Sequence, residues 1–491
     1  MEMYITLDYQ DEKLDFSLKD KIKRFKEITS GSSDLMINEV EICGVKTALL
    51  SCEGMMSTQV VTRLVLVPLT ELNLNTEQKI DATGLFDHID NRMLLSVDRP
   101  KADNYGDAMR LINSGFAVLI ADGNTQALGF GVQGYGIRGI SEPTSEQNIM
   151  GSHDAFTETI RINMSLIRRR LKTPFLKQEL MVMGSKSHTD ICLVYMTDRV
   201  SKNLINRIKK SLGKAELETV LSSGYIRPFL ESRKKGIFTS VGVTERPDVL
   251  CAKLLEGRVG IIVDGTPFVT VIPKLFVENF QTMDDYNCKP YYATFIRWIK
   301  YLAFFVSLLL PGVYVAIAIH HPEFFNRSLL LMLIEAEQEA PLSLITESVI
   351  VLLMYEIIRE AGIRLPQAVG GAVSIVSGLI IGDSAVKSGL ISTPMLTVIA
   401  ISVVSGFVIP SLDHTITVFR FLFLISGGLF GLYGISILGA VMIFNICSTE
   451  SYGVPVTGPV SPFRMSAMRD VMTRVSFRKM QKGNFTIEKI K

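Results

Sequence analysis

Apolar and polar positions alternate in two different ways along this chain. Up to about residue 290, short apolar runs are separated by polar stretches at spacings that predict alternating helices and strands. Beyond Lys300 the pattern changes, because residues 301–319 carry no formal charge and could form a helix that crosses a hydrocarbon layer about 30 Å thick. Three more uncharged runs follow, bounded by Arg364 and Asp383, by Lys387 and Asp413, and by Arg420 and Glu450. Core helices of a soluble protein are the alternative, but the recurrence of such runs favours an all-α, multi-span membrane domain after an α/β region.

Two segments of the α/β region resemble each other. Residues 115–124 and 257–266 each follow a helical run, and each contains a glycine, a strand-like stretch and an Asp-Gly pair before a further apolar stretch. Each copy predicts a helix, a glycine stop, a strand, a tight turn and a second strand. We therefore expect two small subdomains with related helix-strand-turn-strand units.

The composition shifts along the chain suggest four parts. We expect a variable N-terminal region with the first α/β elements at 1–110, an α/β cytoplasmic domain at 111–290, a transmembrane helical domain at 291–450 and a basic cytoplasmic C-terminal tail at 451–491.

The segment after the first span, residues 328–362, carries charges that a lipid-facing helix would not tolerate. Glu347 interrupts its apolar stretch. At 100° per residue, the charged side chains that fall on one broad face are Glu356, Arg359, Glu360 and Arg364. This segment must line water, pack inside an oligomer or lie along the membrane interface.

Positive residues indicate the orientation of the spans. Arg297 and Lys300 precede the first span together with Trp298, the only tryptophan, and such a basic and aromatic flank is typical of the cytoplasmic interface. The C-terminal tail is also basic, with Arg464, Arg469, Arg474, Arg478, Lys479 and Lys482. Both ends are therefore expected in the cytoplasm, which requires an even number of crossings. We expect four, with residues 328–362 re-entrant or shielded within a bundle.

Small residues predict close contacts between helices. They recur every four positions at Gly370, Ser374, Gly378 and Gly382, and the pair Gly427 and Gly431 repeats this spacing. Such patterns let helix backbones approach closely in lipid. The contact could lie within the chain or between subunits, and the pattern does not distinguish them.

Composition and charge narrow the class of protein. Hydrophobic residues make up 47% of the 491 and charged residues 20%, an apolar balance for a soluble chain. The 51 Lys and Arg against 49 Asp and Glu leave a net charge of +2, too small for the positive field that nucleic-acid binding needs. Six cysteines without a Cys-x-x-Cys pair predict reduced thiols and no zinc site. The acidic N-terminus lacks the features of a signal peptide, so the first half is expected to stay in the cytoplasm.

Signatures of catalysis are missing from the sequence. It contains no Walker A loop, no H-E-x-x-H and no G-x-S-x-G motif. We therefore expect no enzymatic activity, no catalytic residues, no metal site and no cofactor. His320 and His321, at the end of the first span, are expected to be hydrated. The basic run at 168–172 is open to two interpretations, a phosphate-binding or membrane-surface patch, or side chains paired with acidic neighbours.

Several motifs occur along the chain in a recognisable order. They are Glu245-Arg246-Pro247-Asp248, the run 254–268, Ser307-Leu-Leu-Leu-Pro311, the run 356–366 and Tyr452-Gly453-Val454-Pro455. With these motifs the chain closely resembles the A subunits of bacterial spore germinant receptors, the GerA family. The resemblance is collinear and covers roughly residues 120–463.

The resemblance implies a cytoplasmic N-terminal region followed by a multi-span region in the inner membrane of the spore. It implies two partners, a transporter-like B subunit that recognises nutrients such as amino acids, and a C lipoprotein. It further implies a homo-oligomeric ring that forms a ligand-gated channel for monovalent cations, in which one acidic side chain per subunit becomes a circle of carboxylates. The pore or gate candidates are Glu347, Glu356 and Asp383, and the other ion-pathway candidates are Arg359, Glu360 and Arg364.

This chain departs from the family pattern where gating and ion selectivity would be set. It has Ala340-Pro341-Leu342-Ser343 where many relatives have Val-Pro-Phe-Pro, Leu352 in place of a second acid, and Asp383 in place of glutamine. Three alternatives therefore stay open. The chain could be an accessory protein like the stage V sporulation protein AF, a non-conducting membrane scaffold, or a secondary transporter. A transporter would predict inverted repeats, and the hydropathy of 301–364 and 365–447 shows no such symmetry.

Overall fold

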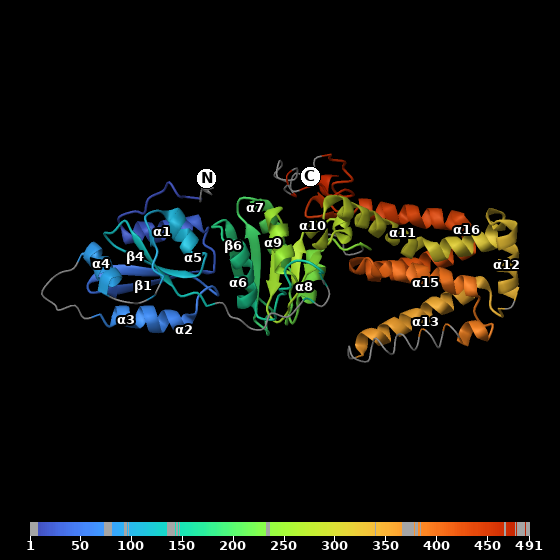
Figure 1. The fold of residues 1–491 in the computed structure, drawn as a ribbon, viewed down its shortest axis with the longest axis horizontal. Helices are drawn as coiled ribbons and strands as arrows, with labels where there is room; N and C mark the ends of the chain where they lie inside the picture. Colours follow the sequence, from blue (N-terminus) through green and yellow to red (C-terminus); the bar gives the residue numbers. More distant parts are fainter. Residues whose placement is uncertain are drawn as a thin grey trace.

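The computed structural model describes residues 8–487 apart from 73–80, 93–95, 97, 135–142, 144–145, 147, 232–235, 339, 366–377, 379–381, 383, 466–467, 477 and 479–486. Two α/β domains and a bundle of long helices follow one another along the long axis of the molecule (Figure 1). We call these parts the first α/β domain (8–134), the second α/β domain (146–289), the helical bundle (290–447) and the C-terminal segment (448–487).

The first α/β domain is built on a five-stranded antiparallel sheet in the order β1-β2-β4-β5-β3. Its strands are β1 (Leu35–Ile42), β2 (Val45–Cys52), β3 (Lys101–Ala102), β4 (Phe116–Ala121) and β5 (Ala127–Gly131). Alternate residues of β4 face opposite sides, so that Val118 and Ile120 belong to one core cluster and Leu119 to another. Helices α1 (Leu18–Ile28) and α5 (Tyr105–Ile112) cover the first side, and α4 (Ala82–Arg92) and the helix Thr58–Thr70, formed by α2 (Thr58–Val60), η1 (Val61–Leu66) and α3 (Val67–Thr70), cover the second.

The second α/β domain has the corresponding strand order, β6-β7-β9-β10-β8, and is also antiparallel. Its strands are β6 (Leu176–Met183), β7 (Thr189–Met196), β8 (Gly242–Thr244), β9 (Val259–Val263) and β10 (Val269–Ile272). Helices α6 (Ile160–Arg170) and α9 (Pro247–Leu255) pack on one face, and α7 (Lys202–Gly213) and α8 (Ser223–Leu230) on the other. The elements η2 (Phe276–Phe280) and α10 (Asp284–Asn287) then lead to the bundle.

The two α/β domains repeat one another down to single hydrogen bonds. In each, the aspartate of the Asp-Gly turn accepts a hydrogen bond from the first backbone N–H of the domain's opening helix. Asp122 accepts from Leu18 at 2.8 Å and Asp264 from Ile160 at 2.9 Å, so both pairs have the same spacing along the chain. A carboxylate at a helix N-terminus is favourable because that end carries unpaired N–H groups and a partial positive charge. The predicted pair of related subdomains is confirmed.

The boundary expected near residue 110 is wrong. Strands β4 and β5 pair with β2 and β3, so the first helix-strand-turn-strand unit completes the first sheet and does not begin a second domain. The glycine stops are as expected, since Gly115 and Gly257 have φ of 88° and 86°, values that side chains rarely allow. The domains divide between residues 134 and 146.

A buried ion pair joins the two α/β domains. Arg168 of α6 donates from Nε to Asp34 Oδ2 at 2.8 Å, and both side chains are 4% exposed. A backbone hydrogen bond from Ser33 to the Gln178 carbonyl, at 2.8 Å, lies beside it. Arg170 pairs with Asp154 at 2.8 Å. In the basic run 168–172, pairing with acidic neighbours therefore accounts for Arg168 and Arg170.

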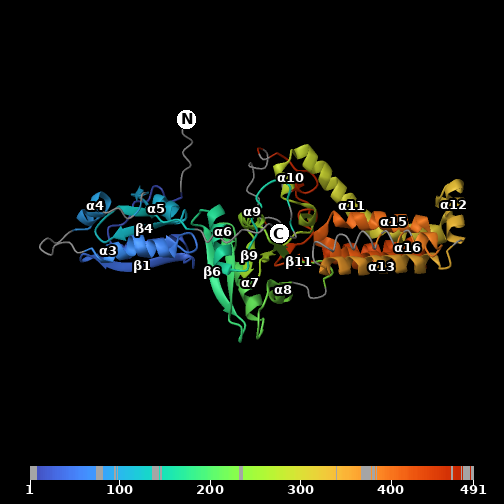
Figure 2. The ribbon, with the colours of Figure 1, turned by 60° about the horizontal axis from the view of Figure 1, so that its bottom comes forward.

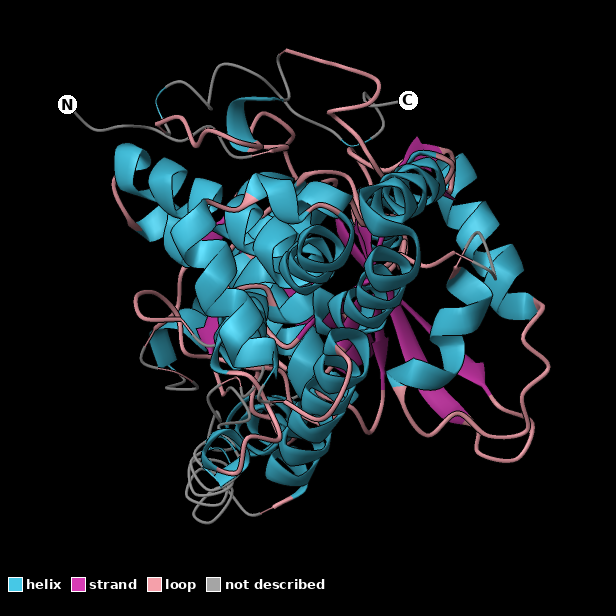
Figure 3. Ribbon diagram, turned by 90° about the vertical axis from the view of Figure 1, so that its right-hand side faces the viewer, coloured by secondary structure: helices cyan, strands magenta, loops and turns pink. Residues whose placement is uncertain are grey.

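The helical bundle contains helices that run along a common direction. Figures 1 and 2 show α13, α15 and α16 side by side, and Figure 3 looks along the bundle with its helices in front of the strands. The helices are α11 (Pro290–His320), α12 (Arg327–Gln338), α13 (Leu344–Arg364), α15 (Thr393–Phe407) and α16 (Asp413–Cys447), with the short turns η3 (Pro322–Phe324) and η4 (Pro410–Leu412). Helix α12 lies at the end of the bundle farthest from the α/β domains (Figure 1).

Helix α16 is a helical hairpin. Its backbone leaves the helical conformation at Gly431, with φ 61° and ψ −152°. A Cβ placed on Gly434 would lie 2.6 Å from the Ser426 carbonyl oxygen, whereas eight residues of straight helix span about 12 Å. The arms 413–430 and 432–447 therefore pack against each other in opposite directions. His320, expected to be hydrated, places Nε2 2.8 Å from the Gly428 carbonyl oxygen at this break.

Two stretches of the described residues are long and apolar enough to cross a membrane, Pro290–His320 and Pro410–Cys447. The second of them folds back at Gly431, so it supplies two passes along the bundle. Helix α13 also runs along the bundle, because Ile345 contacts Gly428 near one end and Arg359 bonds to Asp413 near the other. The segment expected to be re-entrant or shielded therefore continues into a 21-residue helix. The described part of the bundle forms five passes along its length. The hairpin and α13 each add a pass that was not expected, and one of the four expected crossings, the uncharged run between Arg364 and Asp383, lies mostly outside the described residues.

Helices α11 and α16 approach each other closely at two glycines. A Cβ on Gly312 would meet the Phe423 carbonyl oxygen at 2.6 Å, and one on Gly427 would meet the Gly312 carbonyl oxygen at 2.5 Å. In the predicted packing face, Gly378 has open space around it and Gly382 has its nearest neighbour at 3.8 Å. Gly370 and Ser374 lie outside the described residues.

The C-terminal segment folds back onto the second α/β domain. It contains β11 (Glu450–Ser451), β12 (Val454–Pro455) and η5 (Met468–Asp470). Tyr452 is buried in the core beneath α7, and Ile487 donates its N–H to the Glu256 carbonyl at 2.8 Å. The segment expected as a basic tail is thus part of the junction between the α/β region and the bundle.

Candidate functional site

The bundle exposes apolar side chains and buries charged ones. Large apolar residues on α13, α15 and α16 are at least 50% exposed, among them Leu353, Ile357, Val404, Leu429 and Ile437. By contrast, Glu347 and Arg420 are only 1% and 3% exposed. Soluble proteins show the opposite distribution. The outer surface of the bundle is therefore suited to contact with lipid or with another protein. The charged side chains of the bundle lie inside it.

The centre of this buried chemistry is a carbonyl group that a proline leaves free. In α11, the Ser307 carbonyl would accept from the N–H of residue 311, but Pro311 has no N–H. Two side chains from other helices take its place. Ser402 Oγ of α15 donates to it at 2.8 Å and Arg420 Nε of α16 at 2.9 Å. The proline thus creates a binding point where three helices meet.

Arg420 extends from this point into an ionic network. Its Nη1 lies 4.0 Å from Glu356 Oε1, and Thr417 also donates to that oxygen at 3.3 Å. Arg359 then bridges two carboxylates, with Nη2 2.6 Å from Glu356 and Nη1 2.5 Å from Asp413. We call Glu356, Arg359, Asp413 and Arg420, with Ser307 and Ser402, the bundle network. Two arginines balance two carboxylates, so it is neutral overall when all four are charged.

Glu347 lies at a separate place in the bundle. Its Oε1 accepts from both the N–H and the Oγ of Ser392, each at 2.7 Å. Ser392 is the residue before α15, so Glu347 satisfies a donor at the start of that helix. Its second oxygen is buried and has no hydrogen-bond partner among the described residues. Nine residues of helix, about 14 Å, separate Glu347 from Glu356.

The remaining predicted residues belong neither to the bundle network nor to the surroundings of Glu347. Glu360 and Arg364 form an exposed pair on the end of α13, with Oε1 to Nε at 2.8 Å. Asp383 lies outside the described residues. The structure therefore brings together Glu356 and Arg359, keeps Glu347 apart from them and leaves the pair Glu360 and Arg364 at the surface.

Sequence reasoning missed four of the six residues of the bundle network, Ser307, Ser402, Asp413 and Arg420. It used Asp413 and Arg420 only as the limits of uncharged runs, and it used Ser307 and Pro311 only as part of a motif. One signal could have found them. A proline inside a long helix leaves the carbonyl four residues earlier without a donor. Arg420 lies in the apolar part of the chain between Lys387 and Glu450 and could supply that donor.

A second charged cluster lies where the α/β region meets the bundle. Arg297 is fully buried and donates to Asp285 at 2.7 Å and to Asp470 at 2.8 Å. Lys300 lies 3.4 Å from Asp285, and Tyr286 donates to Asp470 at 2.5 Å. Burial, together with the charge of Asp470, raises the pKa of Tyr286. We call these five residues the junction cluster. Arg297 and Lys300 are not the exposed interfacial cations that their place before the first span indicated, because acidic partners from α10 and the C-terminal segment enclose them.

A third ionic group lies under the second sheet. Arg258 is 2% exposed at its side chain and is ion-paired with Glu278 and, at 3.0 Å, with Glu256. Lys253 lies 3.1 Å from Glu278. Burial by itself raises the pKa of Glu278, but the charges of Arg258 and Lys253 outweigh it and lower that pKa to about 2. The pairing is typical of a structural ion pair.

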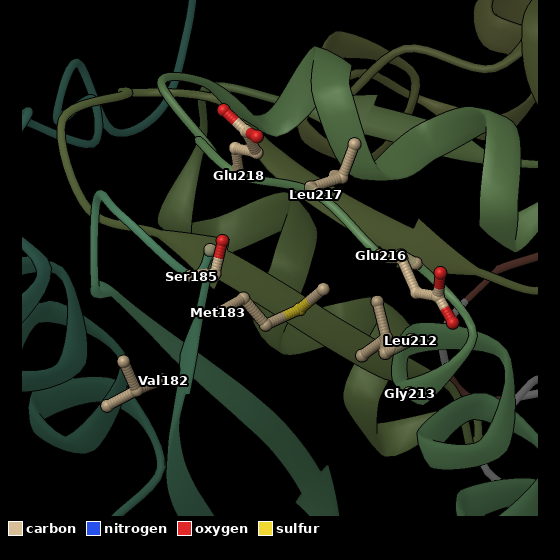
Figure 4. A pocket seen from close by; sticks show the side chains of 10 residues that line it. Val182, Met183, Ser185, Leu212, Gly213, Glu216, Leu217 and Glu218 are labelled. Carbon is tan, nitrogen blue, oxygen red and sulfur yellow. The ribbon is translucent and has the colours of Figure 1, made fainter.

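The surface groove of the second α/β domain offers no comparable chemistry. It has a volume of about 420 Å³ and lies between the β6-β7 turn and the end of α7 (Figure 4). Met183, Leu212 and Leu217 give it an apolar lining, and Glu218 at its edge pairs with Lys186 at 2.7 Å. Among the described residues, no group of three or more His, Cys, Asp or Glu side chains could hold a metal ion.

Comparison with known families gives one match over most of the chain. The model of the Bacillus/Clostridium GerA spore germination protein family matches residues 23–484. That range includes most of the first α/β domain, the whole of the second, the bundle and most of the C-terminal segment.

Individual relatives cover nearly the whole chain. Spore germination protein KA of Bacillus subtilis is 36% identical over 466 residues, which is 94% of this chain and 84% of that protein. The uncharacterized membrane protein YfkQ of the same organism is 32% identical, over 95% of this chain and 90% of its own. Spore germination protein GerLA of Bacillus cereus is 28% identical over 91% of both chains.

The chain is also similar to a solved structure. It is the N-terminal domain of the A subunit of the Bacillus megaterium spore germinant receptor GerK3, with 29% identity and a TM-score of 0.44, and the match covers 55% of this chain and 99% of that one.

Proposed function

This chain belongs to the GerA family of spore germination proteins, and on that premise we propose that it is the A subunit of a nutrient germinant receptor. In this proposal it is a multi-pass protein of the spore inner membrane with both ends in the cytoplasm. Its copies assemble into a ring that conducts monovalent cations when the receptor binds a nutrient. A transporter-like B subunit and a C lipoprotein are its partners. No catalytic reaction is assigned to it.

The observation that carries the proposal is the bundle network inside an apolar exterior. Charged side chains are costly within a membrane, so those present usually mark an ion or substrate pathway. Arg420 is 3% exposed and connects its own helix, α16, to three others through Ser307, Ser402 and Glu356. A change in the position of one helix would break several of these bonds at once, which is a property expected of a gate.

The orientation is supported by the contacts of the C-terminal segment. Asp470 bonds to Arg297 at the start of α11, and Tyr452 lies in the core of the second α/β domain. The α/β domains and the C-terminal segment therefore share one side of the bundle. An even number of crossings follows if the bundle spans the membrane.

The ion-pathway residues keep different roles in this proposal. Glu356 and Arg359 belong to the gate, together with Arg420 and Asp413. Glu360 and Arg364, exposed at the end of α13, are placed to face a pore or a neighbouring subunit. Glu347 positions α15 through Ser392, and its buried second oxygen, which has no hydrogen-bond partner among the described residues, is the acceptor that a cation would bind. Asp383 stays a candidate from sequence.

The test is the conductance of the purified protein in planar bilayers, alone and with its B and C partners. We compare the wild type with Glu356→Gln and Glu347→Gln. Glutamine keeps the shape of each side chain and removes its charge, so a changed cation selectivity or amplitude places that carboxylate on the ion path. Glu218→Gln, at an exposed pair in the second α/β domain, is the matched control and should conduct as the wild type does.

Other outcomes decide between the alternatives. Silence of every folded, oligomeric preparation with partners and nutrient present would favour a scaffold or an accessory protein similar to stage V sporulation protein AF. Uptake of a labelled nutrient without ion current would favour a secondary transporter. The internal repeat of this chain lies in its two α/β domains, whose strands follow the same order along the chain. It therefore gives no support to a transporter built from inverted membrane repeats.

A further inference from the structure

The first turns of α11 expose a set of five aromatic side chains and one leucine. Apart from the adjacent pair Tyr291 and Tyr292, they recur at intervals of three and four residues, which places them on one broad face of the helix. All are between 50% and 72% exposed, and they are Tyr291, Tyr292, Phe295, Trp298, Leu302 and Phe305. We call this set the aromatic face. It begins ten residues before the uncharged run that starts at Tyr301.

The opposite face of the same turns is charged and buried. Arg297 and Lys300 point into the junction cluster, where Asp285 and Asp470 hold them. The cluster therefore fixes the rotation of α11 so that its cations face inward and its aromatic rings face outward. A helix with this face in water would be expected to have the reverse arrangement, with its cations outward and its aromatic rings inward.

The exposed part of Trp298 is apolar, although its ring carries a polar group. Its indole Nε1 donates to the Met472 carbonyl at 3.1 Å, while the side chain as a whole is 61% exposed. The one polar group of the ring is thus satisfied within the protein. What remains outside is ring carbon.

The length of α11 places these turns at a membrane surface. The helix has 31 residues, about 46 Å, while a hydrocarbon core about 30 Å thick needs only about 20 residues. Residues 301–320 fill that need. The preceding turns must extend beyond the core, and Figure 2 shows that they run obliquely to the long axis of the bundle.

A second exposed apolar segment lies beside the start of α11. Ile149 and Met150 are 90% and 58% exposed. Both of their backbone N–H groups donate to Asp284 of α10, at 3.2 and 3.1 Å, and Asn287 donates to the Met150 carbonyl at 2.7 Å. Because α10 directly precedes α11, this apolar loop is held at the end of the helix where the aromatic face begins.

We propose that the aromatic face of α11, together with Ile149 and Met150, is a lipid-contact surface that rests in the headgroup region of the leaflet next to the α/β domains. Tyrosine and tryptophan are enriched at this depth because their rings are apolar with one polar group. The face continues without interruption into the apolar run of α11, which is the reason to assign it to lipid. This inference rests on the proposed membrane location. In this arrangement the junction cluster lies at a fixed depth, so that movement of the α/β domains reaches α11 directly.

The experiment uses Trp298, the only tryptophan of the chain, as its own probe. The full-length protein is reconstituted into phosphatidylcholine and phosphatidylglycerol vesicles whose acyl chains carry bromine, a fluorescence quencher, either near the headgroup or near the chain end. We expect Trp298 to lose fluorescence in both, with the larger loss when bromine lies near the headgroup. No variant is needed for this first measurement, so misfolding cannot imitate the result.

Two control variants make a negative result decisive. Both replace Trp298→Phe, and one adds Phe16→Trp, exposed in the first α/β domain far from the bundle, while the other adds Ile437→Trp, exposed midway along the second arm of α16. Phe16→Trp should not be quenched. Ile437→Trp should be quenched more strongly by bromine near the chain end.

The outcomes separate this inference from the membrane proposal. Quenching of the Ile437→Trp control without quenching of Trp298 overturns the lipid contact and leaves the membrane location standing. Trp298 emission at short wavelength without quenching also overturns it, because another protein surface, such as a second copy, then covers the face. Absence of quenching at both positions, with protein that does not float with the vesicles, contradicts the membrane location itself.

Discussion

The α/β domains and the helical bundle bury their arginines in different ways. Arg168 lies directly against Asp34, and Arg258 lies against Glu278 and Glu256, so each has its charge neutralised by direct contact. Arg420 is buried to a similar extent, but its short hydrogen bond goes to the Ser307 carbonyl and its carboxylate partner lies 4.0 Å away.

This difference separates a structural ion pair from one that can rearrange. Breaking Arg168 from Asp34 would leave a buried charge without its direct counter-charge, so that site favours one arrangement. Arg420 is held by carbonyl groups and shares Glu356 with Arg359, so its charge has more than one acceptable position. We infer that the α/β domains are built to stay rigid and that the bundle network is built to change.

The largest effect on stability is expected for Asp34→Ala. This change leaves Arg168 buried without its counter-charge, which typically costs about 3–5 kcal/mol. Denaturant unfolding of the full chain in detergent, followed by circular dichroism, measures the loss. Glu218→Ala, at an exposed pair, is the control and should change the free energy of unfolding by less than about 1 kcal/mol. Equal losses in the two variants would contradict the view of Arg168 as a structural link.

The next effect is a dependence of stability on pH. The pKa of Glu278 is about 2 in the folded chain and near 4.5 when unfolded, so the folded state gains stability from this group above pH 4.5. That contribution, about 3 kcal/mol, is lost as the pH falls from about 4.5 to 2. Unfolding midpoints at a series of pH values measure the slope. In Glu278→Gln the slope in this window should shrink, and an unchanged slope would show that other carboxyl groups cause it.

A smaller loss of stability is expected for Arg420→Gln. Glutamine can still donate one hydrogen bond, so the cost should resemble the loss of one or two hydrogen bonds, about 1–3 kcal/mol. Conductance should change more than stability does. Lys186→Gln, in an exposed pair of the second α/β domain, is the control. A loss as large as that of Asp34→Ala, with normal conductance, would mean that Arg420 is simply another structural arginine.

The smallest stability change is expected for Pro311→Ala. Alanine supplies the N–H that the Ser307 carbonyl lacks in α11, which competes with Arg420 for that oxygen. The better helix propensity of alanine offsets the weakened contact. Conductance recordings should nevertheless resemble those of Arg420→Gln. Wild-type conductance from a stable Pro311→Ala protein would show that the freed carbonyl does not position Arg420.

Local sequence signals predict much of the α/β region. A glycine stop followed by a strand and an Asp-Gly turn is a signal within ten residues, and both copies fold as expected. The placement of the repeat in the domains was harder to predict, because the pairing of β4 with β2 joins residues about seventy positions apart, and the sequence of each strand does not specify its partner.

The candidate site is less predictable because it depends on contacts across the fold. Glu356 and Arg359 stand out on one helix face, but their partners Asp413 and Arg420 are brought to them by the path of the chain between α13 and α16. Gly431 reverses that helix with no local signal beyond a glycine. Likewise, Arg297 has the same sequence pattern whether it faces headgroups or pairs with Asp285 and Asp470.

The most direct test of the central claim compares one carboxylate from each kind of site. Glu356→Gln and Asp34→Asn both remove a negative charge beside a buried arginine, and cation efflux is measured from vesicles that hold the full receptor and labelled rubidium. We expect Glu356→Gln to alter nutrient-triggered efflux while the complex stays assembled, and Asp34→Asn to leave the efflux of each assembled complex unchanged. Unaltered efflux through assembled Glu356→Gln complexes would contradict the assignment of the bundle network to the gate.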